Sequence, residues 1–172
     1  TEAERDTANA ELLRGFEAAL AELAAMRARE GAIIGQVLGE RVSEIEKLAK
    51  AAESSPSRSV EAIRAKLAEQ VQELIAASST LDPERLHQEA ALLAAKADVR
   101  EELDRLGAHV SAARTLLKNG GAVGRKLDFL AQEFNRESNT LCSKSNDVSL
   151  TAIGLELKTA VDQFREQVQN LE

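Results

Sequence analysis

The chain has 172 residues, of which 44% are hydrophobic and 30% charged, a balance typical of a folded domain and not of a disordered chain. With 2 Pro, 9 Gly, 4 Phe and neither Trp nor Tyr, it has too few turn residues and aromatic strand formers for an all-β fold. The formal net charge of −7 argues against a broad nucleic-acid-binding surface, so any RNA contact must come from a local basic segment.

The apolar residues are scattered, and no run of them approaches the roughly 20 residues of a membrane span. The first residues are acidic and polar, unlike a signal or transit peptide. We therefore expect a soluble, cytoplasmic protein with no membrane partner. The one cysteine, Cys142, excludes an internal disulfide and is expected to be a small core residue.

Residues 2–53 are predicted to form one long amphipathic helix, because Leu12, Phe16 and Leu20 begin an apolar row at helical spacing. Gly31, Gly35 and Gly39 lie four residues apart on one face of this helix. Since they carry no side chain, we expect another helix to approach closely there.

Four further helices follow, separated by clusters of Ser, Asn, Gly and Pro. They are predicted over 60–77, 82–117 and 124–142, with a last helix that ends near residue 170. Asp82, Pro83 and Glu84 form a strong helix start signal, and Gly120 and Gly121 a stop signal. The fold class is therefore all-α, with about five helices, two of them long. Such long helices favour an extended bundle completed by oligomerisation.

This pattern divides the chain into three parts. Residues 1–53 form a helical arm, residues 54–81 a linker with a second helix and a turn, and residues 82–172 a C-terminal helical domain. The one local basic segment runs from Arg114 to Lys126, where four cations occur with no acidic residue.

Asp98, Glu102, Arg105 and His109 lie along one flank of the predicted third helix. Carboxylates suit Mg²⁺ or Mn²⁺, imidazole binds a metal ion or exchanges protons, and arginine matches a phosphate. The structural alternative stays open: Asp98 would cap a helix break, and Glu102 and Arg105 would form an exposed ion pair.

The predicted fourth helix is denser in polar groups. Asp128, Gln132, Asn135 and Asn139 share one flank, whereas Glu133, Glu137 and Thr140 share the other. The carboxylates could hold a hydrated divalent ion, and the amides, Arg136 and Lys144 could contact phosphate or sugar oxygens. A polar network between helices or at a subunit interface explains the same residues equally well.

Three segments carry a family resemblance: GAVGRKLDFLAQEFNRESNTLCSKSNDVSL from Gly121, ERLHQEAALLAAKADVREELDRLGAHV from Glu84, and ELKTAVDQFREQVQNLE from Glu156. Together they resemble very closely the bacterial YicC/YloC family. The resemblance is strong from about Asp82 onward and weak before about Leu20.

This resemblance implies a divalent-metal-dependent endoribonuclease, with Mg²⁺ or Mn²⁺ as cofactor, that cuts single-stranded or structured RNA and contributes to small-RNA turnover. It also implies a homo-oligomer, a hexamer, that clasps RNA. Family members resemble two-part molecules with a β-rich N-terminal half, which we expect to be absent from this chain.

The resemblance carries over the polar residues of these segments, and the residue chemistry assigns their roles. Metal ligands are predicted at four carboxylates: Glu102, Glu133, Glu137 and Asp98. Catalytic roles are predicted for His109, Glu102 and Glu137, with His109 as a ligand or proton shuttle. Predicted RNA contacts are Arg105, Arg125, Lys126, Asn135, Arg136, Asn139 and Lys144.

Two competing functions remain open. The chain could be a helical oligomerisation scaffold with catalysis in the β-rich half, since it is acidic and contains long helices. It could also be an RNA-binding adaptor, which would bind RNA without cleaving it.

Overall fold

The computed structural model describes residues 2–77, 84, 88, 91, 98–145 and 147–171. Its helices are α1 (Glu2–Glu53), the 3₁₀ turn η1 (Pro56–Arg58), α2 (Val60–Ala77), α4 (Arg100–Asn119), α5 (Gly124–Lys144) and α6 (Val148–Val168). The described residues contain no strand, so the predicted all-α class is confirmed.

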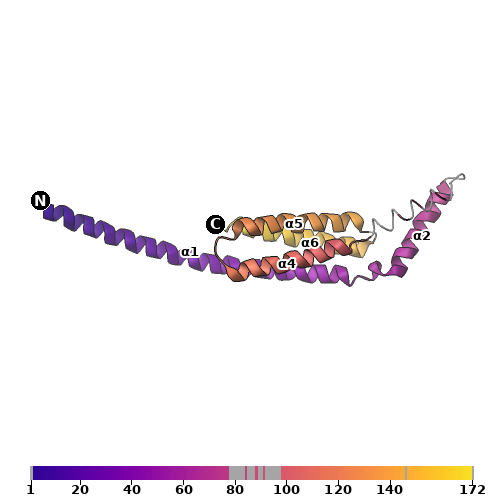
Figure 1. The fold of residues 1–172 in the computed structure, drawn as a ribbon, viewed down its shortest axis with the longest axis horizontal. Coiled ribbons are helices and arrows are strands. Elements are labelled where there is room, and N and C mark those ends of the chain that lie inside the picture. The colour runs from indigo at the N-terminus through magenta and orange to yellow at the C-terminus, as the bar shows by residue number, and fades with distance from the viewer. Residues whose placement is uncertain are drawn as a thin grey trace.

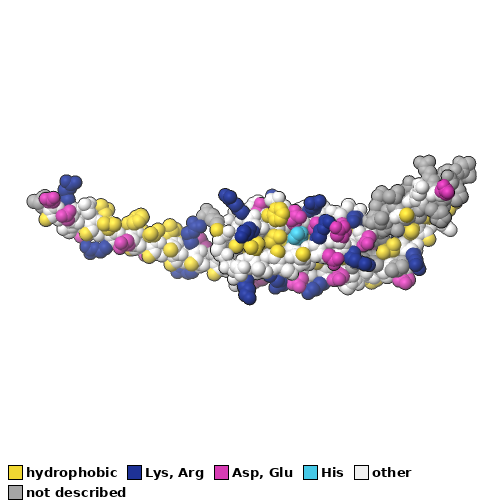
Figure 2. Space-filling model, viewed as in Figure 1, with side chains coloured by type: hydrophobic (Ala, Val, Ile, Leu, Met, Phe, Trp, Pro, Cys, Tyr) yellow, Lys and Arg dark blue, Asp and Glu magenta, His cyan; other side chains and the backbone are white. Residues whose placement is uncertain are grey.

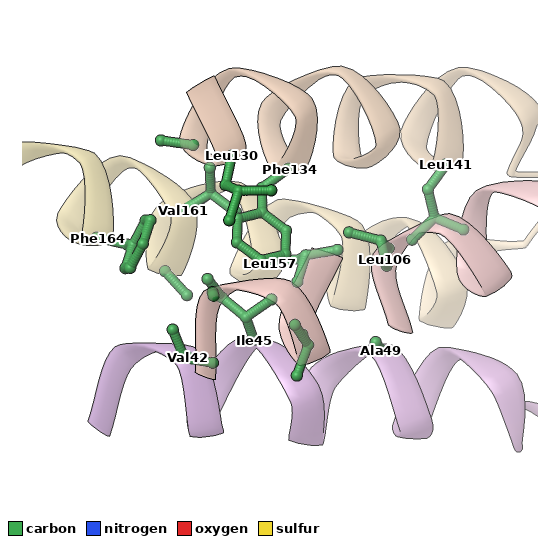
Figure 3. Packing of buried hydrophobic residues seen from close by; sticks show 14 of the residues in the cluster. Val42, Ile45, Ala49, Leu106, Leu130, Phe134, Leu141, Leu157, Val161 and Phe164 are labelled. Atoms are coloured by element: carbon green, nitrogen blue, oxygen red, sulfur yellow. The ribbon is translucent and has the colours of Figure 1, made fainter. Parts of the chain in front are cut away.

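The second half of α1 packs with α4, α5 and α6 into a four-helix bundle (Figure 1). Going round the bundle, α5 lies between α4 and α6, and α1 contacts both α4 and α6. Large apolar side chains from all four helices fill the centre (Figure 3). The four largest of those that are completely buried are Phe134, Phe164, Leu38 and Ile45.

Helix α1 is continuous over the predicted length, but its two halves have different surroundings. Its buried residues fall between Leu38 and Ala52, where they face the bundle. The earlier part extends beyond the bundle (Figure 1), and there Leu12, Phe16 and Leu20 are 71%, 67% and 55% exposed.

The predicted close helix contact at Gly31, Gly35 and Gly39 is not present among the described residues. A Cβ atom built at any of the three would meet nothing within 4 Å. The prediction is therefore wrong for contacts within the chain, because these glycines lie at the point where α1 enters the bundle.

A single helix over 82–117 is also wrong, since Asp98 and Val99 are not helical and α4 starts at Arg100. The Asp98 carboxylate accepts a hydrogen bond of 2.9 Å from the Arg100 backbone N–H, which favours a turn over a continuous helix. The predicted start at Asp82 lies outside the described residues. The predicted stop is found, and Gly120 and Gly121 have φ of +65° and +82°, which favour glycine.

Helices α5 and α6 form a close antiparallel pair. Asp147 begins α6 by accepting hydrogen bonds from Ser149 and Leu150, which lower the pKa of its carboxyl group by favouring the charged form. A Cβ atom at Gly154 would lie only 2.6 Å from the Cys142 sulfur, so any larger residue there would have to displace the Cys142 side chain. Cys142 is half-buried, and burial raises the pKa of its thiol.

In the described part of the chain, no helix is both long enough and apolar enough to cross a bilayer.

Candidate functional site

Three potential metal ligands from two helices meet at the surface between α4 and α5. His109 of α4 and Glu133 and Glu137 of α5 each offer one ligand atom, and these atoms all lie within 4.8 Å of one another. Glu133 and Glu137 are one turn apart and so share one face of α5. We refer to these three residues as the triad.

The triad is buried more deeply than an ordinary surface charge cluster. Glu137 is only 1% exposed, yet its Oε2 atom has no hydrogen-bond partner, and neither has the buried Nε2 atom of His109. The His109 ring also packs edge-on against Phe134, with 6.0 Å between ring centroids. Buried polar atoms are normally hydrogen-bonded, so an unpartnered atom on each of these two triad residues is available to bind a ligand.

The other oxygen of Glu137 is engaged. Its Oε1 atom accepts a hydrogen bond of 3.3 Å from Arg105, which also pairs with Glu101. The hydrogen bond to Glu137 and the charge of Glu101 raise the pKa of Arg105. Arg105 remains 45% exposed and pairs with one of the two triad carboxylates, so the cluster keeps an excess of negative charge.

A small divalent cation fits this donor set. Carboxylate oxygens are the preferred ligands of Mg²⁺ and Mn²⁺, and one imidazole nitrogen shifts the preference towards Mn²⁺. Such an ion would give partners to both unpartnered atoms and would neutralise the excess charge.

The structure separates Glu102 and Asp98 from the triad. Glu102 is 4% exposed, and its Oε1 atom accepts a hydrogen bond of 2.9 Å from Lys144. Lys144 also donates to the Asp98 backbone carbonyl at 3.1 Å, while the Asp98 carboxylate is used in the turn before α4. Among the described residues these two carboxylates are not in the three-ligand cluster.

The amide flank of α5 faces α6. Asn139 donates to Asn135 at 2.6 Å, and Asn135 donates to Asp162 of α6 at 3.4 Å. On the same flank Gln132 donates to Asp128. Asn135 and Asn139, two of the predicted RNA contacts, therefore belong to a polar network between helices and lie on the other flank of α5 from the triad.

The predicted basic contacts lie in different surroundings. Arg125, Lys126 and Arg136 are exposed along α5, with no ion pair in the described part of the chain. Arg114, in contrast, pairs with Glu46 of α1 at 2.6 Å, so the basic segment 114–126 is not a uniformly free positive surface.

One exposed side chain beside the triad was missed from the sequence. Phe129 is 59% exposed and lies one turn before Glu133 on α5. The sequence could have indicated Phe129 as a candidate site residue, because it lies four residues before Glu133 and an aromatic residue on a polar helix flank is unusual.

Residues 52–172 match the family described as "Endoribonuclease YicC-like, C-terminal". A curated protein of Haemophilus influenzae, "Probable endoribonuclease YicC", is 43% identical over 99% of this chain and 58% of its own length. A protein of the same name from Clostridioides difficile is 36% identical over 94% of this chain and 55% of its own length. The chain thus spans little more than half the length of these relatives.

Proposed function

The chain belongs to the YicC-like endoribonuclease family, and from this premise we propose that it provides the metal centre of a divalent-metal-dependent endoribonuclease. The observation that carries the proposal is the triad, in which Glu137 Oε2 and His109 Nε2 are buried without partners. A solvated charge row would leave these atoms in contact with water instead.

In this proposal His109, Glu133 and Glu137 hold the ion. A bound divalent cation would act as a Lewis acid that stabilises negative charge on the phosphoryl oxygens. It would also lower the pKa of a bound water molecule towards neutrality. The residues keep separate tasks: the carboxylates fix the ion's position, and the half-buried His109 is placed to bind it or to exchange a proton. Arg105, 45% exposed beside Glu137, is placed to contact a non-bridging phosphate oxygen.

The proposed substrate is single-stranded or structured RNA, and small-RNA turnover in the cytoplasm is the proposed role. The exposed cations Arg125, Lys126 and Arg136 supply local positive charge on a chain whose net charge is −7. Their placement along the helix that carries Glu133 and Glu137 lets one RNA backbone contact them and reach the metal centre.

The deciding experiment is cleavage of end-labelled RNA by this chain, with Mn²⁺ or Mg²⁺ and with chelator. The double variant Glu133→Gln/Glu137→Gln should lose metal-dependent cleavage and keep its helical circular dichroism spectrum. A matched control is Glu156→Gln/Glu166→Gln, which neutralises two exposed glutamates of α6. Undiminished cleavage by the triad variant would refute the proposal.

We also propose that the protein is a homo-oligomer, a hexamer, assembled through the first half of α1. The supporting observation is a row of exposed apolar side chains on the arm outside the bundle: Leu12, Leu13, Phe16, Leu20, Leu23 and Met26. Apolar rows of this length on one helix normally face a partner. Phe16→Glu/Leu20→Glu should lower the mass measured by analytical ultracentrifugation, and an unchanged mass would contradict assembly through this arm.

A scaffold is the second candidate, and the same exposed arm favours it. The cleavage assay and a binding measurement with the same labelled RNA separate the candidates, because a scaffold neither binds nor cleaves RNA and an adaptor binds without cleaving.

A further inference from the structure

A groove between α4 and α5 lies next to the triad. It is lined by three residues of α4 and four of α5, namely Ala112, Thr115, Leu116, Arg125, Lys126, Phe129 and Leu130. Phe129 is the large side chain left exposed in this groove, with 59% of its surface open. A large apolar ring kept at the surface lacks hydrophobic stabilisation that a ligand packed against it would supply.

The groove is continuous with the metal centre along both helices. On α5, Phe129 precedes Glu133 by four residues, which is about 6 Å along the helix axis. On α4, Ala112 follows His109 by three residues, again one turn. The face in Figure 2 agrees, since hydrophobic side chains gather on one side of the histidine and charged side chains on the other.

The positive charge that lines the groove favours an anionic ligand. Arg125 and Lys126 line it, and neither forms an ion pair in the part of the chain that the structure describes. Lys126, Phe129 and Glu133 follow one another at three- and four-residue steps and so share a face of α5. An aromatic ring flanked by free cations is the combination that binds single-stranded nucleic acid, the ring taking a base and the cations the phosphates.

We infer that Phe129 is a base-stacking platform for a nucleotide of single-stranded RNA, with Arg125 and Lys126 on its phosphates. This subsite deepens the proposed endoribonuclease function and rests on it. It makes Phe129 a positioning residue, because a base held one helical turn from the triad fixes which phosphodiester reaches the metal centre.

The chain contains no Trp and no Tyr, so Phe129→Trp introduces its one tryptophan at the groove. This variant is titrated with a short single-stranded oligoribonucleotide in chelator, where no metal-dependent cleavage occurs. We expect the RNA to quench the tryptophan fluorescence, and an abasic oligonucleotide of equal length to leave it nearly unchanged. Leu155→Trp, at an α6 site 56% exposed, is the matched control and should show no quenching by either oligonucleotide.

A second measurement uses fluorescence anisotropy of labelled RNA. Phe129→Ala should weaken RNA binding by about 5- to 150-fold, the loss expected for one stacked base. Phe129→Leu should weaken it nearly as much, because leucine keeps apolar bulk and lacks a ring face. Binding by Phe129→Ala at the unchanged affinity would overturn the inference.

The outcomes distinguish this inference from the proposed function. Quenching without metal-dependent cleavage leaves the subsite intact and refutes the metal centre. Cleavage with no quenching, or equal quenching by the abasic oligonucleotide, overturns the subsite alone. Tryptophan emission that is already blue-shifted without RNA, and that shifts back on dilution, would show that another copy covers Phe129 and would overturn it as well.

Discussion

Two buried glutamates on neighbouring helices each contact one cation but differ in the other charged groups around them. Glu102 of α4 is 4% exposed and bonds to Lys144 at 2.9 Å, while Glu137 of α5 is 1% exposed and is 3.3 Å from Arg105. Each keeps one buried oxygen without a hydrogen-bond partner. Within the described part of the chain, Glu137 alone of the two belongs to a group of three potential ligands, with His109 and Glu133.

The difference teaches that burial of a carboxylate is not by itself a sign of a functional site. Glu102 and Lys144 form a one-to-one pair that ties α4 to the end of α5, so their charges cancel. The triad carries two carboxylates against one half-exposed arginine, so its charges do not cancel. We therefore expect Glu102 to respond as part of the fold and the triad to respond to metal ions.

The largest expected effect tests the paired glutamate. Lys144→Met leaves Glu102 buried without its cation and should lower the free energy of unfolding by about 3 kcal/mol, measured by urea denaturation. Glu102→Leu/Lys144→Met removes both charges and should recover most of that loss. Equal stabilities for Lys144→Met and the unsubstituted chain would mean that the pair contributes nothing to the fold.

The triad should show the reverse behaviour. Without metal, Glu133→Gln/Glu137→Gln removes two neighbouring like charges, so stability should stay unchanged or increase. With Mn²⁺ at 100 times its dissociation constant, the unsubstituted chain should gain about 2.7 kcal/mol and the double variant nothing. Thermal melts with Mn²⁺ and with chelator measure both effects. An equal metal-induced increase in melting temperature in the two proteins would mean that the ion binds outside the triad.

Arg105 tests whether the triad's own cation competes with a metal ion. Arg105→Met frees Glu137 Oε1, so the affinity for Mn²⁺ measured by titration calorimetry should rise several-fold while RNA binding weakens. Arg100→Met, on the exposed first turn of α4, is the control. If both affinities fell together, Arg105 would be supporting the triad's geometry instead.

The sequence predicted the helices well where periodicity alone decides them. The C-terminal end of α1 and the start of α5 coincide with Ser, Pro and Gly clusters, and the stripe containing Glu133 and Glu137 follows from 3.6-residue spacing. The boundary before α4 was predicted only as the alternative in which Asp98 caps a helix break, because one side-chain hydrogen bond, and no loss of apolar pattern, marks it.

Partners across helices could not be predicted in the same way. Spacing shows that His109 and Glu137 each lie beside an apolar stripe, and the structure shows that these flanks meet. The same spacing made Glu102 an equally good candidate metal ligand. Its actual contact, with Lys144, depends on where α5 ends relative to α4. Periodicity fixes the face of a helix and leaves open its axial position against the next helix.

A half-buried carboxylate, Glu46, gives the smallest expected effect. Glu46 of α1 is paired with Lys50 on its own helix and with Arg114 of α4, and these hydrogen bonds lower the pKa of its carboxyl group from the ordinary 4.5. Because both ions of the interhelical pair are partly solvated, Arg114→Met should cost about 0.5–1 kcal/mol at neutral pH.

The pH dependence of that loss follows from the direction of the shift. A carboxyl group whose pKa is lower in the folded chain contributes stability that is complete above its unfolded value, near 4.5, and disappears as pH falls through the folded value. The stability difference between Arg114→Met and the unsubstituted chain should therefore be constant from about pH 7 to pH 5 and shrink below pH 4.5. Lys118→Met removes a cation from the same helix without breaking an ion pair, so its difference should stay small throughout. A loss for Arg114→Met that persists undiminished at pH 3 would assign its effect to packing of the arginine stem and not to the Glu46 charge.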